Sequence, residues 1–464
     1  MKKSNKKNSK LWGGRFKKPT DPAFDVFSAS YRWDCRLFSY DIEIDRAHVK
    51  ALRRCGVLSV SEEKKLQSAL ASLKKSYDLG VLKLSESSED VHSAIQTELK
   101  SIAGSVADKI HTGRSRNDLV SQSSRLYLKD HLGRIEKLIS QLQRAWVSQA
   151  EQNQKCFVAA MTHMQPAQIM SQAHIFLSYV EMLERSKAQV RTALGFCDVC
   201  VLGSGALAGS TYDLSQTQMA KALGLSAVTN NSYDVSGDRD FVLTGLFALE
   251  MIGVHLSRIA EDLMIAQTRG YMTVDIDQPF CTGSSMMPQK KNADFVELAR
   301  GAAGIFIGNL AGFASTLKGL PTSYNRDLQW DKKFIFESVE TCEDILDIFT
   351  RLASSLKVNS DRTELFLKDE SLYATDLADY LVNRGVPFKQ AHEQVGQIVS
   401  FAEDQNIAIS KIGIDLLKKF TPSVEADIYD IFSPAHSVAF KKTQGSTSPG
   451  EVKKQIQRWK TKLK

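Results

Sequence analysis

The segment GSSMMPQKKN at residues 283–292 gathers two hydroxyl groups, a cation and an amide in one loop that contains glycine and proline. Neither serine lies in a GxSxG elbow, which disfavours acyl transfer. Lys290 and Asn292 supply donors that could stabilise a carbanion delocalised into a carboxylate. Ser284 could then act as a general base if Lys290 and loop amides stabilise its alkoxide. Glu297, on the helix expected to follow, could orient a histidine.

Two more segments place polar groups just before expected helices. HTGRSRND (111–118) holds two guanidinium groups, a hydroxyl and an amide, a set that suits carboxylate or phosphate recognition. EDVHSA (89–94) places an acid pair beside His92. The alternatives are structural: a solvated loop with a helix cap for the first segment, and an N-cap with acids in the first turn for the second.

A lone histidine and a polar run complete the candidates. His163, in THMQPAQ (162–168), could exchange protons near neutral pH, although a lone histidine is more often structural. The run SYNRDLQWDKK (323–333) offers many polar anchors and could equally be a solvated face.

Two patterns that might suggest other chemistry are rejected. GSGALAG (203–209) resembles a phosphate cradle, but no strand is expected before it and no Lys-Ser/Thr follows it, so packing of a bend is favoured. Cys197 and Cys200 form a CxxC pair without a second Cys/His pair, which argues against zinc. We therefore expect chemistry without a metal or other cofactor.

The elements that must position these groups are expected to be helices. The chain contains no proline between residues 22 and 166, between 166 and 279, or between 321 and 387. Stretches of that length without proline permit long helices. Apolar residues recur every three or four positions in two long stretches. They are Leu128, Leu132, Ile135, Ile139, Leu142 and Trp146, and then Leu249, Ile252, Leu256, Ile259 and Leu263. With no comparable β-alternating runs, the sequence predicts an all-α fold around a central bundle of long helices.

We expect three parts in this chain of 464 residues: 1–112, 113–363 and 364–464. The net charge of +7 comes from basic ends, and the body lacks a basic face with interleaved aromatics, which argues against nucleic-acid binding. Seven scattered cysteines and no apolar signal-peptide region indicate a reducing cytosol. The apolar stretch 301–314 is shorter than a membrane span and is expected to be a buried core helix.

The GSSMMPQKKN segment resembles the fumarase/aspartase superfamily, whose signature is GSSxMPxKxN. Within it the chain closely resembles the argininosuccinate lyase family, through motifs that follow in order over nearly the whole chain. These are LWGGRF (11–16), EDVH, HTGRSRND, THMQPAQ, GSGALAG, DRDFV (238–242), KGLPTSYNRDLQWDK (318–332), ATDLADYLVNRGVPFKQAH (374–392) and GSTSPGEVKKQI (445–456).

The resemblance implies a reversible anti β-elimination of argininosuccinate to arginine and fumarate, without a cofactor. Ser284 would take the Cβ proton, and Lys290 and Asn292 would hold the resulting aci-carboxylate. His163, paired with Glu297, would assist proton transfer to the leaving nitrogen or orient a water that does so. Ser115, Arg116, Asn117 and Thr162 would bind the succinyl carboxylates. Ser30, Asp90, Tyr324, Gln329 and Lys332 would hold the arginine-like end, with His92 close by. The family also implies a homotetramer whose sites draw on three subunits.

The chain departs from the family pattern in three places: Ala293 replaces a usual proline, ALAGST (206–211) replaces ALAGNP, and Trp330 replaces a commonly acidic residue. None of these changes removes a chemical group. Adenylosuccinate lyases and fumarases share the serine loop, but HTGRSRND and YNRDLQWDK favour argininosuccinate. This family has also been recruited as a lens crystallin, so a purely structural tetramer is an alternative. The intact His92, His163 and Ser284 argue against it.

Overall fold

The computed structural model describes residues 18–86 and 88–464, so the lysine-rich start and LWGGRF (11–16) lie outside the described residues. Helices dominate, and the all-α prediction is confirmed. The helices are α1 (Pro22–Ser28), α2 (Tyr31–Asp34), α3 (Phe38–Arg54), α4 (Val60–Asp78), α5 (Val91–Ala103), α6 (Arg116–Gln152), α7 (Gln172–Cys197), α8 (Gln216–Ala222), α9 (Ser232–Gly237), α10 (Asp240–Gln267), α11 (Asp294–Leu317), α12 (Asp331–Ser355), α13 (Ser360–Phe366), α14 (Ala374–Asn383), α15 (Phe388–Asp404), α16 (Ile414–Phe420), α17 (Pro434–Ala439) and α18 (Pro449–Lys462).

Short strands and 3₁₀ turns connect these helices. The strands are β1 (Phe157–Thr162), β2 (Gln165–Ser171), β3 (Val199–Cys200), β4 (Ala227–Val228), β5 (Val274–Asp275) and β6 (Lys357–Val358). They pair as β1–β2 and β5–β6, both antiparallel, and β3–β4, which is parallel. The 3₁₀ turns are η2 (Cys35–Leu37), η3 (Gly104–Lys109), η4 (Gln278–Phe280), η5 (Arg326–Trp330), η6 (Glu370–Tyr373), η7 (Ile409–Lys411) and η8 (Ala426–Ile431).

The chain divides into two compact units, each assembled from separate stretches. The first unit contains the residues up to 132, together with 192–246 and 309–337. The second unit contains 133–191, 247–308 and 338–464. The boundaries fall inside α6, α7, α10, α11 and α12.

In the first unit, α3, α4 and α5 pack against one another beside the start of α6. Helix α4 shows why the sequence folds this way locally. Its buried residues Leu66, Ala69, Leu70 and Leu73 follow helical spacing, and Ser59 with Glu62 forms a capping box at its start. The packing of these helices positions the segments directly before α5 and α6. Those two segments contain several of the predicted site residues.

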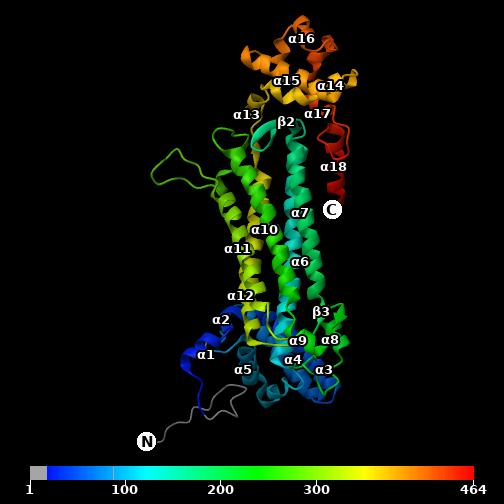
Figure 1. Ribbon diagram of the computed structural model, residues 1–464. Helices are drawn as coiled ribbons and strands as arrows, with labels where there is room; N and C mark the ends of the chain where they lie inside the picture. Colours follow the sequence, from blue (N-terminus) through cyan, green and yellow to red (C-terminus); the bar gives the residue numbers. More distant parts are fainter. Residues whose placement is uncertain (1–17, 87) are drawn as a thin grey trace. The chain divides into compact units, whose positions relative to one another are not determined.

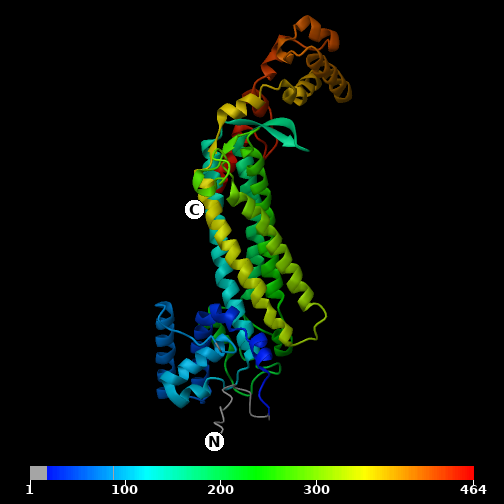
Figure 2. The same ribbon diagram turned by 90° about the vertical axis from the view of Figure 1, so that its left-hand side faces the viewer.

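In the second unit, parts of α6, α7, α10, α11 and α12 run side by side in both views (Figures 1 and 2). Trp146 of α6 is buried and stacks on Phe176 of α7, with ring centroids 5.3 Å apart. Helices α14 to α17 form a separate apolar cluster with β2 in the same unit. As predicted, Gly385 and Pro387 lie between the end of α14 and the start of α15.

Both predicted apolar stripes are confirmed. All six apolar residues of the first stripe, which runs from Leu128 to Trp146, are buried. So are all five of the second stripe, which runs from Leu249 to Leu263. Helix α10 is long and apolar enough to cross a membrane, and 56% of its most apolar window is buried, as in a core helix. Residues 301–314 were expected to form a buried core helix, and this prediction is confirmed only in part. This stretch of α11 buries Phe306 and Phe313 but exposes Ile305 and Ile307.

The β1–β2 hairpin was not predicted. Proline disfavours strands, yet Pro166 lies within β2. It pairs with Met161 next to the register shift between Ala160 and Met161, and such irregularities tolerate proline. The turn places His163 and Met164 in the left-handed region, with φ of 54° and 60°. Two-residue hairpin turns of this kind favour Asn-Gly, so the His-Met sequence gave no turn signal.

Candidate active site

The predicted site residues fall into two groups, one in each unit. The first unit holds Ser30, Asp90, His92, Ser115, Arg116, Asn117, Tyr324, Gln329 and Lys332. The second unit holds Thr162, His163, Ser284, Lys290, Asn292 and Glu297. The first group therefore contains substrate-binding candidates, and the second contains all the catalytic candidates and Thr162.

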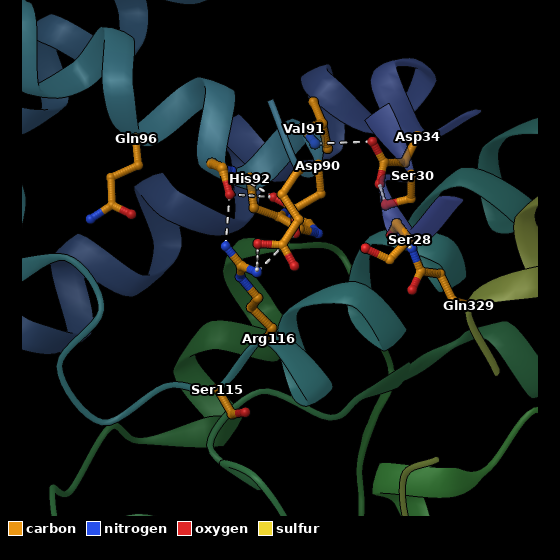
Figure 3. Close-up of polar contacts among 12 residues, drawn as sticks. Ser28, Ser30, Asp34, Asp90, Val91, His92, Gln96, Ser115, Arg116 and Gln329 are labelled. Carbon is orange, nitrogen blue, oxygen red and sulfur yellow. Dashed lines mark hydrogen bonds and ion pairs between the residues drawn. The ribbon is translucent and has the colours of Figure 1, made fainter. Parts of the chain in front are cut away.

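Arg116, the first residue of α6, lies against the start of α5 (Figure 3). Its Nη1 lies 3.2 Å from Glu89 Oε2 and 3.4 Å from Asp90 Oδ2, and its Nη2 donates to Ser93 Oγ at 2.7 Å. Asp90 is the N-cap of α5, and its Oδ1 accepts from the Ser93 amide at 2.8 Å. The N-cap of the structural alternative is therefore confirmed, whereas its acids in the first turn are not, because the first turn of α5 contains no acid. Burial alone would raise the pKa of Asp90, but His92 and Arg116 hold it below its ordinary value.

His92 and Ser30 each contact a buried carboxyl group. His92 Nδ1 forms an ion pair with Asp41. Burial disfavours the charged imidazolium, but Asp41 raises the pKa of His92 above its ordinary value. Ser30 Oγ donates to Asp34 Oδ2 at 2.5 Å, and Asp34 Oδ1 accepts from the Val91 amide at 2.9 Å. Burial raises the pKa of Asp34. These contacts tie the residue before α2 to the start of α5 (Figure 3).

Ser115 and Asn117 belong to the capped start of α6. Ser115 Oγ accepts from the Asn117 amide at 3.2 Å, and Asp118 Oδ1 accepts from the Ser115 amide at 3.0 Å. The cap considered for HTGRSRND is therefore present. Asn117 Nδ2 donates to the Ala206 carbonyl at 3.0 Å, which fixes the direction of its amide group.

The residues after Pro321 approach the segment around α1. Gln329 Nε2 donates to the Ser28 carbonyl at 3.0 Å. Lys332 is buried, and its Nζ lies 3.5 Å from Asp331 Oδ1. Tyr324 is partly buried in the segment before η5. A cavity of about 220 Å³ is lined by Phe24, Phe27, Ser28, Ala29, Ser30, Arg32, Trp33, Arg326, Asp327, Gln329 and Trp330. Ser30 and Gln329 thus reach a common cavity.

In the second unit, the serine loop is closed by a β-bridge. Thr282 and Asn292 exchange two backbone hydrogen bonds of 2.9 and 2.8 Å. Inside the loop, Ser284 Oγ accepts from the amides of Met287 at 3.1 Å and Met286 at 3.3 Å. Two amide donors on one hydroxyl oxygen favour its alkoxide form, as a serine base requires.

Of the other candidates in this unit, Asn292 is half-buried, and Lys290, Glu297, His163 and Thr162 are exposed in the single chain. Lys290 lies in the same loop, Glu297 lies in the first turn of α11, and Thr162 and His163 lie at the tip of the β1–β2 hairpin. Within the described residues, no hydrogen bond or ion pair joins His163 to Glu297, so their pairing stays a prediction. His163 also lines a largely apolar cavity of about 440 Å³ that β1, β2, α7, α10 and α13 surround.

Four acids hold the predicted residues without having been assigned that role from the sequence: Asp34, Asp41, Asp118 and Glu89, the last of which was noted only as part of an acid pair. Only Asp118 and Glu89 left a local signal. Asp118 stands three residues after Ser115, the spacing of a capping box, and Glu89 stands beside Asp90. Asp34 holds Ser30, four residues before it, but its contact with Val91 and the contact of Asp41 with His92 join residues that only folding brings together. Among the described residues, no group of three or more His, Cys, Asp or Glu side chains is arranged to hold a metal ion.

Comparisons with known proteins now give the family. A family model described as "Lyase" matches residues 14–308, and one described as "Argininosuccinate lyase C-terminal" matches 371–439. Argininosuccinate lyase from Caldicellulosiruptor bescii is 40% identical over 449 residues, which are 97% of each chain. The chain belongs to the argininosuccinate lyase family. The Bacillus subtilis argininosuccinate lyase is 38% identical, over 97% of this chain and 98% of the relative.

Solved structures agree with the fold. An EDDS lyase in complex with formate is 28% identical, with a TM-score of 0.83 over 96% of this chain and 90% of that one. A class II fumarase from Schistosoma mansoni, 14% identical with a TM-score of 0.73 over 87% and 91% of the two chains, supports the fold alone. This member of the argininosuccinate lyase family is thus an all-α lyase of the fumarase/aspartase type.

Proposed function

We propose that the chain converts argininosuccinate reversibly into arginine and fumarate by anti β-elimination, as the last step of arginine biosynthesis. The observation that carries this proposal is the serine loop, in which Ser284 Oγ accepts two backbone amide hydrogen bonds. Ser284 takes the Cβ proton as its alkoxide. Family membership supplies the substrate, because the curated relatives are named for argininosuccinate.

The negative charge that develops in the elimination needs fixed donors. Lys290 and Asn292 hold the aci-carboxylate, and His163 with Glu297 assists proton transfer to the leaving nitrogen or orients a water that does so. A solved EDDS lyase variant with bound fumarate supports the product assignment, at 27% identity and a TM-score of 0.82 over 96% of this chain and 91% of that one.

The first unit binds the rest of the substrate. Ser115, Arg116 and Asn117, with Thr162 of the second unit, bind the succinyl carboxylates. Ser30, Asp90, Tyr324, Gln329 and Lys332 hold the arginine-like end, with His92 beside them. The common cavity that Ser30 and Gln329 reach supports this assignment. The division of the chain into 1–112, 113–363 and 364–464 also remains our proposal.

The working enzyme is a cytoplasmic homotetramer whose active sites combine residues of three subunits. Helix α11 supports assembly, because Leu298, Ile305 and Ile307 are 72%, 40% and 46% exposed in the single chain. The exposed catalytic residues support shared sites, since a base and its donors work best when water is excluded. Sedimentation should give the mass of four chains, and a monomer with full activity would contradict this proposal.

Fumarate release, followed by ultraviolet absorbance, tests the reaction. Argininosuccinate should give fumarate, whereas adenylosuccinate and malate should not. Ser284→Ala should lower kcat by roughly 10²–10⁴-fold, the usual contribution of a general base. Ser285→Ala is the matched control, because it removes the neighbouring hydroxyl and should leave the rate unchanged. No fumarate from argininosuccinate would contradict the function, and an inactive Ser285→Ala beside an active Ser284→Ala would contradict the base.

A further inference from the structure

The glycine-rich segment GSGALAG (203–209) cradles an anion that belongs to the chain itself. Asp118 Oδ2 accepts from the amides of Gly203 at 3.1 Å and Gly205 at 3.0 Å. Both glycines have positive φ, 92° and 59°, which lets their amides converge on one oxygen. The expectation that no strand precedes this segment was wrong, because β3 (Val199–Cys200) ends three residues before Gly203. The amides of the segment nevertheless bind a carboxylate of the chain itself.

Asp118 uses its other oxygen for a different contact. Asp118 Oδ1 accepts from the Ser115 amide at 3.0 Å, which closes the cap of α6. One buried carboxylate thus holds the start of α6 on one side and the glycine-rich segment on the other. The segment in turn accepts from Asn117, whose Nδ2 donates to the Ala206 carbonyl at 3.0 Å. This contact fixes the direction of the Asn117 amide group, and the Asn117 backbone amide, which donates to Ser115 Oγ at 3.2 Å, fixes that of the Ser115 side chain.

We propose that Asp118 is a positioning residue that clamps residues 203–206 to the first turn of α6 and so orients Ser115 and Asn117 toward the substrate carboxylates. The inference rests on the proposed function, in which Ser115 and Asn117 bind those carboxylates. Asp118 itself touches no substrate, because its two oxygens are occupied by backbone amides and its side chain is buried.

The clamp requires an ionised carboxylate, because both oxygens act as acceptors. Burial raises the pKa of Asp118 to about 6, against the opposing effect of Arg114 and of the three backbone donors. The charged or titratable groups that face it are Arg114, before α6, and the Cys200 thiol on β3. Protonation would turn one acceptor oxygen into a donor directed at an amide N–H, and the clamp would open.

Asp118→Asn tests the clamp with little change of shape, since the amide nitrogen cannot accept from a backbone N–H. We expect kcat/KM to fall about 100-fold, the order of loss that a small misplacement of binding groups causes, with most of it in KM. The wild-type enzyme should lose kcat/KM as pH falls through about 6, the pKa of Asp118, and Asp118→Asn should lack this acid limb. Asp213→Asn is the control, because Asp213 is an exposed carboxylate whose Oδ1 accepts from the nearby Ser215 amide at 3.2 Å. Its KM should stay unchanged.

Gly205→Ala provides a second test that keeps the carboxylate. An added Cβ would lie 2.7 Å from the Gly209 carbonyl oxygen at a φ of +59°, so the Gly205 amide must move away from Asp118. Loss of that donor should raise KM and move the acid limb to higher pH. Hydrogen exchange gives a readout without substrate: the Gly203 and Gly205 amides should be protected in the wild type and exchange faster in Asp118→Asn.

The outcomes separate this inference from the proposed function. A wild-type protein that releases no fumarate from argininosuccinate contradicts the function, whatever the exchange rates are. An active wild type with Asp118→Asn at the same KM and with the same acid limb overturns the clamp alone. If Asp118→Asn fails to fold, Gly205→Ala is the deciding variant. An acid limb at the wild-type pH together with a wild-type KM in Gly205→Ala overturns the inference.

Discussion

The ion pair between Arg239 and Asp331 gives the sharpest stability prediction. Arg239 Nε lies 2.7 Å from Asp331 Oδ2, and both side chains are 0% exposed. Lys332 is also buried, with its Nζ 3.5 Å from Asp331 Oδ1. Asp331→Ala would therefore leave two cations in the interior without their nearest anion. Breaking a buried pair in this way costs about 3–5 kcal/mol, and the second cation places the expected loss near the upper end.

Urea unfolding measures this loss. A loss of about 4 kcal/mol is a large share of the roughly 5–15 kcal/mol that stabilises a typical domain, so the midpoint should shift clearly. Asp108→Ala is the control, because Asp108 pairs with Lys100 at 2.8 Å on the surface and should cost at most about 1 kcal/mol. The double change Arg239→Met with Asp331→Leu should recover the part of the loss that the unpaired Arg239 causes, while the part that the unpaired Lys332 causes should remain. A loss below about 1 kcal/mol for Asp331→Ala would refute the reasoning.

Two further predictions concern packing and pH. Gly253→Ala should destabilise by about 1–3 kcal/mol, because the new Cβ would lie 2.3 Å from a ring carbon of Phe306. Gly396→Ala, on α15 with nothing within 4 Å of its added Cβ, should instead stabilise by about 0.5–1 kcal/mol in a thermal unfolding assay of both variants. Equal effects would refute the packing argument. His111 has its pKa lowered to about 3 by burial and by the nearby Arg114, so its contribution is present above pH 6.5 and is lost as pH falls below that value. His111→Asn should therefore reduce the slope of unfolding free energy between pH 6.5 and 5 by about 1.4 kcal/mol per pH unit, and an unchanged slope in urea titrations would contradict this.

Sequence reasoning was strongest where a local pattern determines the structure. The apolar stripe that ends at Trp146 follows from helical spacing alone, because burying one helix face requires that spacing. The β1–β2 hairpin was missed because its turn residues His163 and Met164 adopt positive φ without the Asn or Gly that usually marks such a turn in a sequence. Cap residues such as Ser115 were recognisable from their neighbours.

The support around the candidate site was harder to predict. Asp41 and His92 lie on different helices, and no local rule links residues that far apart. Asp118 was within an identified motif, but its partners Gly203 and Gly205 are more than eighty residues away. Motifs therefore indicated which groups could do chemistry, whereas the acids that orient them depend on the packing of α3, α5 and α6.

The interleaved composition of the two units has a consequence for synthesis on the ribosome. The first unit takes its last stretch from residues 309–337, so it lacks part of its core until that stretch has emerged. The second unit begins at residue 133 but needs 338–464, which leave the ribosome after its other two stretches. During translation the apolar faces of α7 and α10 therefore stay partly unburied until α12 and α18 have been synthesised. A nascent chain of this kind exposes substantial apolar surface for most of its synthesis, which makes it a natural client for chaperones that bind such surface.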